Sequence, residues 1–320
     1  MKKNILKILC FFFILGILLR IVSLFLMPKY NREKYGMRDE KANGIFGEKE
    51  NTIDVLVVGD SEAYTSIIPM KMWEEYGFTT YVCATPAQCL VDSIEFTYDA
   101  MKTQTPKIVI LEADNIYREV YYGTPPEKIL KRIWPVVRYH TRWKELKKED
   151  LIPVAHYTYT DDLKGYKFTD SIREADSSKY MCESDKKSEI PYANKLYVKL
   201  LKKYCDMNDA KLMIISTPSV ENWNYEKHNS LTEFTDQEGI EFLDLNELKD
   251  ELKIDWKKDS KDGGDHLNYY GALKVTAYLE KYLFDQGILD DHREDDNYRE
   301  WNDTLIKYKE IVSEAEKNEV

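Results

Sequence analysis

The sequence lacks the composition of a nucleic-acid-binding protein. It contains 57 Asp and Glu residues against 46 Lys and Arg residues, which gives a formal net charge of −11. No arm rich in Lys and Arg offsets this balance. Because proteins bind nucleic acids largely by neutralising phosphate charge, the sequence argues against nucleic acid as a partner.

Spacings typical of metal ligands are also missing. The chain has five His and five Cys residues, without a Cys-x-x-Cys or a His-Glu-x-x-His. We therefore expect no metal and no other cofactor. Repeats and low-complexity tracts are absent too, so 320 residues predict one α/β domain with extensions. The Cys residues, all expected to be free thiols, are Cys10, Cys83, Cys89, Cys182 and Cys205.

One long apolar run stands near the N-terminus. Residues 5–27 are almost wholly apolar, and about 20 such residues cross a bilayer. Arg20 interrupts the run, and a charge inside a membrane helix usually has a partner. Either the segment is a retained anchor in which Arg20 meets a partner protein or lipid headgroups, or it is a signal peptide. No cleavage site with small residues follows, which favours the anchor.

The charges around the apolar run bear on its orientation. Lys2, Lys3 and Lys7 favour an N-terminus inside the cell, although three basic residues at positions 29–34 weaken this inference. We expect a single-pass protein of the cell membrane, with residues 1–28 as transmembrane anchor and residues 29–51 as linker. The following domain is then extracytoplasmic. In the reverse orientation it faces the cytosol.

Beyond the linker, short β-branched runs alternate with helical patterns, which is typical of a parallel sheet covered by helices. Residues 52–286 form the predicted domain, interrupted by an insertion at about residues 116–188. The insertion is either a substrate-recognition cap over the active-site edge or a peripheral decoration. Residues 287–320 predict a charged amphipathic helix that docks on the domain or, alternatively, binds a partner. The predicted strands are residues 53–58, 81–84, 107–111, 211–217 and 241–245.

The tripeptide Gly59-Asp60-Ser61 follows the first predicted strand. Open α/β sheets bind ligands beyond the carboxyl ends of their strands, so Ser61 occupies a good place for a nucleophile. The same three residues also make ordinary turns and helix N-caps. The rest of the chain must therefore decide between the two interpretations.

A matching basic residue stands near the other end of the domain. His266 lies in a Gly-rich loop that also contains Asp262 and Asp265, just before the helical pattern at 270–283. A Ser after the first strand and a His before the last helix can meet at one edge of a doubly wound sheet. Position 263, three residues before His266, is a glycine, so the orienting carboxylate is either Asp265 or Asp262.

Together, Gly59-Asp60-Ser61 and Asp265-His266-Leu267-Asn268 resemble the SGNH (GDSL-type) hydrolase superfamily. The resemblance covers roughly residues 50–285 and implies a flavodoxin-like three-layer α/β domain with a parallel sheet. The segment at 138–143 narrows it to the DltD-like SGNH proteins of Gram-positive bacteria, which are anchored in the membrane. That group implies a membrane-bound O-acyltransferase (MBOAT) as partner and an acylated polymer of the cell envelope, such as a teichoic acid, as substrate.

The superfamily also implies an oxyanion hole, and here the sequence departs from its pattern. Where a Gly is expected after the second strand, the chain has Ala87, whose backbone N–H can still donate. Asn115 is the candidate side-chain donor, without the usual preceding Gly. The backbone amide of Ser61 is the third expected donor.

Two functions from different classes follow. In the first, the protein is an SGNH-type serine esterase or O-acyltransferase, with Ser61 as nucleophile, His266 as base, and Asp265 or Asp262 as orienting carboxylate. In the second, which the altered motifs favour, it is a non-catalytic accessory protein that binds the polymer or scaffolds a membrane O-acyltransferase. In the reverse membrane orientation, a third and weaker alternative is a cytosol-facing hydrolase of small esters.

Overall fold

A computed structural model describes residues 2–118, 124–152 and 154–318. It divides the chain into two compact units. The first, which we call the N-terminal unit, combines residues 1–40 with residues 120–159. The second, the sheet unit, comprises residues 41–119 and 160–320. The first part of the predicted insertion thus groups with the N-terminal segment, while residues 160–188 belong to the sheet unit.

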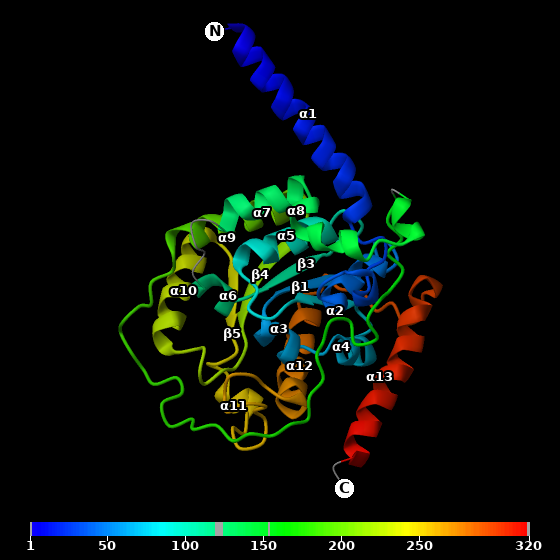
Figure 1. The fold of residues 1–320 in the computed structure, drawn as a ribbon. Helices are drawn as coiled ribbons and strands as arrows, with labels where there is room; N and C mark the ends of the chain where they lie inside the picture. Colours follow the sequence, from blue (N-terminus) through cyan, green and yellow to red (C-terminus); the bar gives the residue numbers. More distant parts are fainter. Residues whose placement is uncertain (1, 119–123, 153, 319–320) are drawn as a thin grey trace. The chain divides into compact units, whose positions relative to one another are not determined.

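The sheet unit is built on five parallel strands, as the sequence predicts (Figure 1). Their order, β2-β1-β3-β4-β5, is that of flavodoxin-like doubly wound sheets. Nearly every strand residue is buried, which is why the strands read as continuous apolar runs rather than alternating patterns. The strands are β1 (Val55–Gly59), β2 (Thr80–Ala84), β3 (Ile108–Glu112), β4 (Lys211–Ser216) and β5 (Glu241–Asp244).

Helices cover both faces of the sheet and complete three layers (Figure 1). On one face, side chains such as Leu56 and Val109 pack against α5 (Leu90–Ala100), α9 (Tyr192–Met207) and α10 (Tyr225–Glu238). The opposite face, which includes Val57 and Ile110, packs against a second group of helices. These are α3 (Ser61–Ser66), α4 (Pro69–Tyr76) and α12 (Tyr269–Phe284).

The C-terminal helix α13 (Arg299–Asn318) docks on the sheet unit, as expected from its amphipathic pattern. Trp301 and Tyr308 are both 2% exposed, and Trp301 packs against Trp73 of α4 with ring centroids 5.6 Å apart. Trp73 also donates a hydrogen bond to Asn302.

The short elements of this unit are η2 (Gly44–Gly47), α6 (Asp114–Tyr117), α11 (Lys249–Leu252) and η5 (Asp296–Tyr298), and α2 (Glu40–Asn43) begins at the unit boundary.

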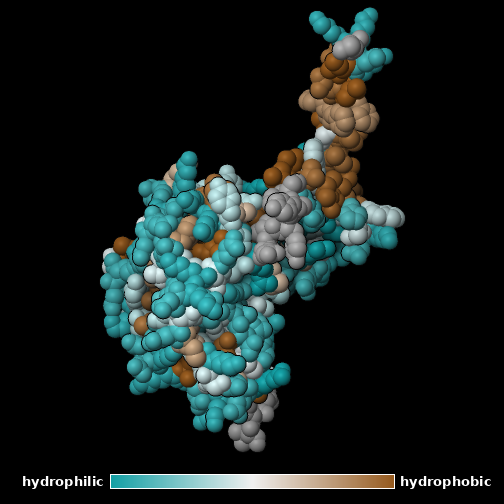
Figure 2. Space-filling model, turned by 90° about the vertical axis from the view of Figure 1, so that its left-hand side faces the viewer, coloured by the Kyte–Doolittle hydropathy of each residue, from teal (hydrophilic) through white to brown (hydrophobic). Residues whose placement is uncertain are grey.

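The N-terminal unit begins with α1 (Lys2–Leu26), which is long and apolar enough to cross a membrane. Its surface is a nearly continuous hydrophobic area with a hydrophilic tip, as Figure 2 shows. The remaining elements of this unit are η1 (Glu33–Tyr35), α7 (Thr124–Ile133), α8 (Val136–Tyr139), η3 (His140–Lys144) and η4 (Lys148–Leu151). The five Cys residues all lie in the described part of the chain, and none of them forms a disulfide.

Candidate active site

The turn after β1 is shaped by close packing at the carboxyl edge of the sheet. A Cβ on Gly59 would come within 2.6 Å of the Cβ of Glu112 at the end of β3, so only glycine fits. The Asp60 carboxylate then accepts a hydrogen bond from the Glu62 backbone N–H at 3.2 Å and caps α3. Ser61 is thereby held as the first, half-buried residue of a helix.

His266 is fixed by two hydrogen bonds to one carboxylate. The Oδ2 atom of Asp262 lies 2.8 Å from His266 Nδ1, and its Oδ1 accepts the His266 backbone N–H, also at 2.8 Å. Asp265 lies further from the same ring nitrogen, at 3.4 Å. Of the two carboxylates that the sequence left open, Asp262 is the one that engages the imidazole more closely. A proton held on Nδ1 leaves Nε2 as the basic nitrogen.

The charge state of Asp262 suits this contact. Partial burial acts to raise its pKa, but the hydrogen bonds from His266 outweigh this and hold the pKa below its ordinary value. Asp262 is therefore ionised throughout the neutral range and can stabilise a positive charge on the imidazole.

Asn222, in the loop after β4, links the serine loop to the histidine loop. Its side-chain amide donates to Glu62 Oε1 at 2.6 Å and to Asp265 Oδ1 at 2.5 Å. A ring nitrogen of His266 and carboxylate oxygens of Glu62 and Asp265 lie within 4.8 Å of one another. The structure thus brings His266 beside the residue that follows Ser61.

Among the described residues, Glu62, Asp265 and His266 form the cluster whose donors could hold a metal ion. Two features oppose this use. The amide of Asn222 already donates to both carboxylates. Burial, then the neighbouring Glu112, raises the pKa of Glu62 well above its ordinary value, which disfavours the charged carboxylate that a metal ion would bind. A protonated carboxyl is a poor metal ligand.

Acidic groups and two cations lie next to the turn that precedes Ser61. Burial, followed by the neighbouring Asp114, raises the pKa of Asp60 to about 6. Arg118 opposes this shift through contacts of 2.5 Å with Asp60 and 3.3 Å with Asp114. Lys227 binds the other oxygen of Asp114 at 2.8 Å. The two cations therefore compensate buried carboxyl groups that would otherwise repel each other.

The long segment at residues 160–190 passes the site without forming a helix or strand (Figure 1). Its Lys167 backbone N–H donates to the carbonyl of Tyr64, one turn after Ser61, at 2.8 Å. Further along, the backbone N–H of Arg173 donates to the carbonyl of Ser260 at 2.9 Å. Burial raises the pKa of Tyr64 while a hydrogen bond with the Ser61 side chain lowers it, so the phenol faces the serine hydroxyl. This half of the predicted insertion therefore lies at the rim of the candidate site.

Ala87 has the backbone conformation of the glycine that it replaces. Its φ is +53°, in the left-handed region that favours glycine. The Gln88 N–H bonds the Thr85 carbonyl at 3.2 Å across a turn with Pro86 as its second residue. This pattern is that of a type II turn, whose third residue is usually Gly. The exposed Ala87 therefore has a conformation in which Gly is usual, at the position where the superfamily pattern predicts Gly.

Asn115 is fully buried, and its amide is already engaged. The Nδ2 atom donates to the Gln88 carbonyl at 3.0 Å and to Ser93 Oγ at 3.2 Å, while Oδ1 has no partner. In this arrangement Asn115 holds the Ala87 loop in place. Its assignment as an oxyanion donor stays a prediction that requires the amide to exchange one of these partners.

Sequence reasoning missed three side chains at this site: Glu62, Tyr64 and Asn222. Glu62 and Tyr64 follow Ser61 directly and within one helical turn, so the helix that starts at Ser61 brings them to the rim. Asn222 follows β4, and the rule that ligands gather at carboxyl ends of parallel strands would have marked its loop.

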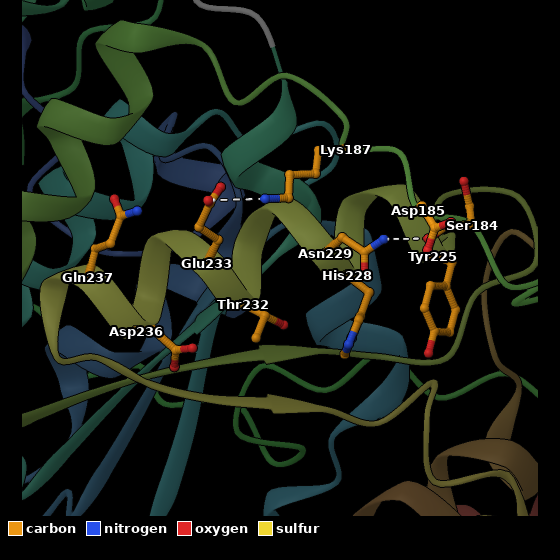
Figure 3. A pocket seen from close by; sticks show the side chains of 10 residues that line it. All are labelled: Ser184, Asp185, Lys187, Tyr225, His228, Asn229, Thr232, Glu233, Asp236 and Gln237. Carbon is orange, nitrogen blue, oxygen red and sulfur yellow. Dashed lines mark hydrogen bonds and ion pairs between the residues drawn. The ribbon is translucent and has the colours of Figure 1, made fainter.

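A second His–Asp pair lies outside this site. His228 Nδ1 is 2.7 Å from Asp244 Oδ2, at the end of β5. His228 also lines a hollow of about 550 Å³ along α10, together with Tyr225 and Asn229 (Figure 3). The hollow contains none of the predicted catalytic residues, and sequence reasoning did not foresee the pairing of His228.

Comparisons with known proteins complete the description. No protein-family model matches the chain, and no curated protein matches it. Similar solved structures include the lipase/acylhydrolase from Enterococcus faecalis, with 9% identity, 75% of this chain and 98% of that chain covered, and a TM-score of 0.41. A GDSL-like lipase from Bacteroides thetaiotaomicron gives 9% identity, 72% and 88% coverage, and a TM-score of 0.37.

A third solved structure is an acetyl xylan esterase, with 11% identity, 73% of this chain and 100% of that chain covered, and a TM-score of 0.38. These neighbours are acylhydrolases and GDSL-type esterases by name. Likenesses at this level of identity and TM-score do not assign an activity, so function is argued from the site itself.

Proposed function

We propose that this protein is an SGNH-type serine hydrolase or acyltransferase that acts on acyl esters. One observation carries the proposal: the Asp262 carboxylate binds both Nδ1 and the backbone N–H of His266, on a loop joined through Asn222 to the loop of Ser61. A half-buried, ionised orienting group, a His with one free ring nitrogen, and a Ser at a helix start are the parts that acyl transfer needs.

The proposed reaction has two steps. Ser61 Oγ attacks the ester carbonyl carbon while Nε2 of His266 takes the hydroxyl proton. The C–O bond to the leaving alcohol breaks, the imidazolium returns the proton to that alcohol, and an acyl group remains on Ser61. Water or a second hydroxyl then attacks the acyl-enzyme with His266 again as base, the bond between the acyl group and Ser61 Oγ breaks, and the imidazolium returns the proton to Ser61. The oxyanion is stabilised by the amides of Ser61 and Ala87.

The test is hydrolysis of a chromogenic acyl ester by the full chain. Ser61→Ala and His266→Ala are expected to abolish turnover. His228→Ala, which removes the other His–Asp pair, is the matched control and should retain it. Turnover that survives in both Ser61→Ala and His266→Ala would contradict the proposal.

The cellular setting belongs to the same proposal. Helix α1 anchors the protein as a single pass in the cell membrane with the sheet unit outside the cytoplasm. The substrate is an acylated envelope polymer, and an MBOAT partner supplies the acyl group. The apolar length of α1 and the resemblance to DltD-like proteins support this setting. Protease accessibility of the sheet unit in intact cells tests the orientation, and co-purification of a multi-span acyltransferase tests the partner.

A second candidate function rests on Asn115 and Ala87. Because the Asn115 amide is engaged within the protein and Ala87 replaces glycine, the oxyanion hole could be non-functional, leaving an accessory protein that binds the polymer. A fluorophosphonate probe separates the two functions. Labelling that depends on Ser61 supports the enzyme, whereas polymer binding without labelling supports the accessory protein.

A further inference from the structure

Residues 127–152 of the N-terminal unit, which we call the interfacial segment, expose an unusual amount of apolar surface. In α7, Ile129, Leu130 and Ile133 are 57%, 44% and 49% exposed. The spacing of Ile129 and Ile133 places them on one face of the helix. Later in the segment Trp143 is 64% exposed and Leu151 is 61% exposed. A water-facing surface of this kind normally marks an interaction site.

The charge of the interfacial segment is opposite to that of the whole chain. It contains eight Lys and Arg residues against four Asp and Glu, in a chain whose net charge is −11. Part of this charge is used internally: Arg142 pairs with Asp150 at 2.9 Å, and Lys131 with Glu127 at 2.5 Å. The segment nevertheless retains a positive balance beside its apolar side chains. That combination is typical of helices that lie in the interface of an anionic bilayer.

The interfacial segment is also attached to the C-terminal half of α1. Trp134 Nε1 donates to the Gly16 carbonyl at 3.2 Å, and the Val136 N–H donates to Ser23 Oγ at 2.9 Å. Arg142 donates to the carbonyl of Leu26 at 2.6 Å. At 1.5 Å per residue, these contacts extend along α1 from about 6 Å before Arg20, at Gly16, to about 9 Å after it, at Leu26.

Arg20, the charged residue inside the apolar run, has its partner in the same place. Its guanidinium donates to the carbonyl of Ile133, the last residue of α7, at 3.3 Å. An Arg in a membrane helix is tolerated near the headgroups, where it reaches water and phosphate. The level of Arg20 therefore marks the membrane boundary, and α7 ends at that level.

From these observations we infer that the interfacial segment lies on the membrane surface and inserts its apolar side chains between anionic phospholipid headgroups. It forms a second, peripheral attachment beside α1. The inference rests on the anchoring of α1 in the proposed function. The bilayer is favoured as occupant because the surface is both apolar and cationic and continues from the candidate membrane helix.

The experiment uses the full chain in nanodiscs containing phosphatidylglycerol and phosphatidylcholine. Cys10, Cys89 and Cys182 are replaced by Ser, and an environment-sensitive fluorophore is attached to either Ile129→Cys or Leu151→Cys. Leu200→Cys on α9 is the matched control, because Leu200 is an apolar helix residue 54% exposed in the sheet unit. Phe12→Cys on α1 reports whether the anchor itself is in lipid.

We expect the fluorophores at 129 and 151 to be quenched by lipid-borne doxyl groups and to show iodide quenching about threefold weaker than at Leu200. Changing Lys144, Lys147 and Lys148 to Gln should raise iodide quenching at 151 toward that of Leu200. Water-exposed probes at 129 and 151 with Phe12 in lipid overturn the inference alone. A water-exposed Phe12 probe overturns the anchoring as well. Protection from iodide without doxyl quenching shows that protein, not lipid, covers the segment.

Discussion

The two His–Asp pairs of the sheet unit have nearly the same geometry but different surroundings. His266 Nδ1 lies 2.8 Å from Asp262, and His228 Nδ1 lies 2.7 Å from Asp244. Asp262 is partly exposed in a loop, and His266 lies beside the loop of Ser61. Asp244 is buried at a strand end. The same His–Asp contact therefore occurs once beside Ser61, the candidate nucleophile, and once at the buried end of a strand.

The partners of the two carboxylates explain the difference. Asp244 also accepts hydrogen bonds from Ser216 at 2.5 Å and from Trp223 at 3.0 Å, so His228 is one of several donors to a structural carboxylate. Asp262 binds both the ring and the backbone of His266. A His–Asp distance alone thus does not identify a catalytic pair. The other groups that contact the carboxylate and the imidazole must be considered too.

The largest expected effect comes from removing the nucleophile. Ser61→Ala should lower kcat for acyl-ester hydrolysis by about 10⁴-fold or more, because no acyl-enzyme can form. Steady-state kinetics measure the loss, and circular dichroism of the variant checks that the fold is intact. Retention of more than a tenth of the wild-type rate would contradict the role of Ser61.

Replacing each of the two histidines by alanine tests the comparison directly. His266→Ala should reduce kcat nearly as much as Ser61→Ala, since the two residues act as one unit. His228→Ala should leave kcat within about twofold and instead lower the melting temperature, because it leaves Asp244 with one donor fewer. Equal losses of activity in the two variants would show that the surroundings do not distinguish the pairs.

Within the histidine loop, the two carboxylates should differ as their distances do. Asp262→Asn is expected to lower kcat by about 10³-fold or more, because the imidazole loses its orienting charge. Asp265→Asn, at the longer distance, should cost about tenfold or less. Kinetics of the two variants side by side decide the order, and the reverse order would assign the orienting role to Asp265.

The pH dependence of stability should reveal the structural pair. The hydrogen bond to Asp244 raises the pKa of His228 above its ordinary value of 6.5, despite some desolvation. Its extra stabilisation is therefore fully present below pH 6.5 and is lost as the pH rises through the folded-state pKa. Unfolding free energies of the wild type and His228→Gln should differ by up to about 1 kcal/mol at pH 5.5 and less at pH 8.5. A gap that widens with pH would be the opposite of this expectation.

The smallest effect is expected at the Ala87 loop. Ala87→Gly removes the cost of a positive φ on a residue with a Cβ, which should stabilise the fold by at most about 1 kcal/mol. Activity should stay within about twofold, because the backbone N–H is kept. Chemical denaturation and ester hydrolysis measure both quantities, and a large loss of activity would mean that the methyl group itself contacts the substrate.

The parallel sheet could be predicted from the sequence because most of its strands are short, continuous apolar runs that are buried on both faces. The rule about carboxyl edges of such sheets predicted that Ser61 and His266 share one edge, and the structure places His266 beside Glu62, the residue after Ser61. The choice between Asp262 and Asp265 could not be predicted, since it depends on how Gly263 and Gly264, with φ of +90° and +101°, fold the loop back.

The N-terminal unit was not predictable for a different reason. Residues 41–119 separate its two halves in the sequence. The contacts that join the halves, such as Arg20 to Ile133 and Trp134 to Gly16, involve backbone carbonyls. Carbonyl acceptors occur at every residue and leave no pattern in the sequence. A charged residue in an apolar run indicated that a partner exists but not which one.

The most direct measurement is to map the adduct that a fluorophosphonate probe forms with the full chain. The account predicts one adduct, on the peptide containing Ser61, which is lost in His266→Ala and retained in His228→Ala. A protein that hydrolyses acyl esters but carries the adduct on another residue, or carries it on Ser61 independently of His266, would contradict the central claim.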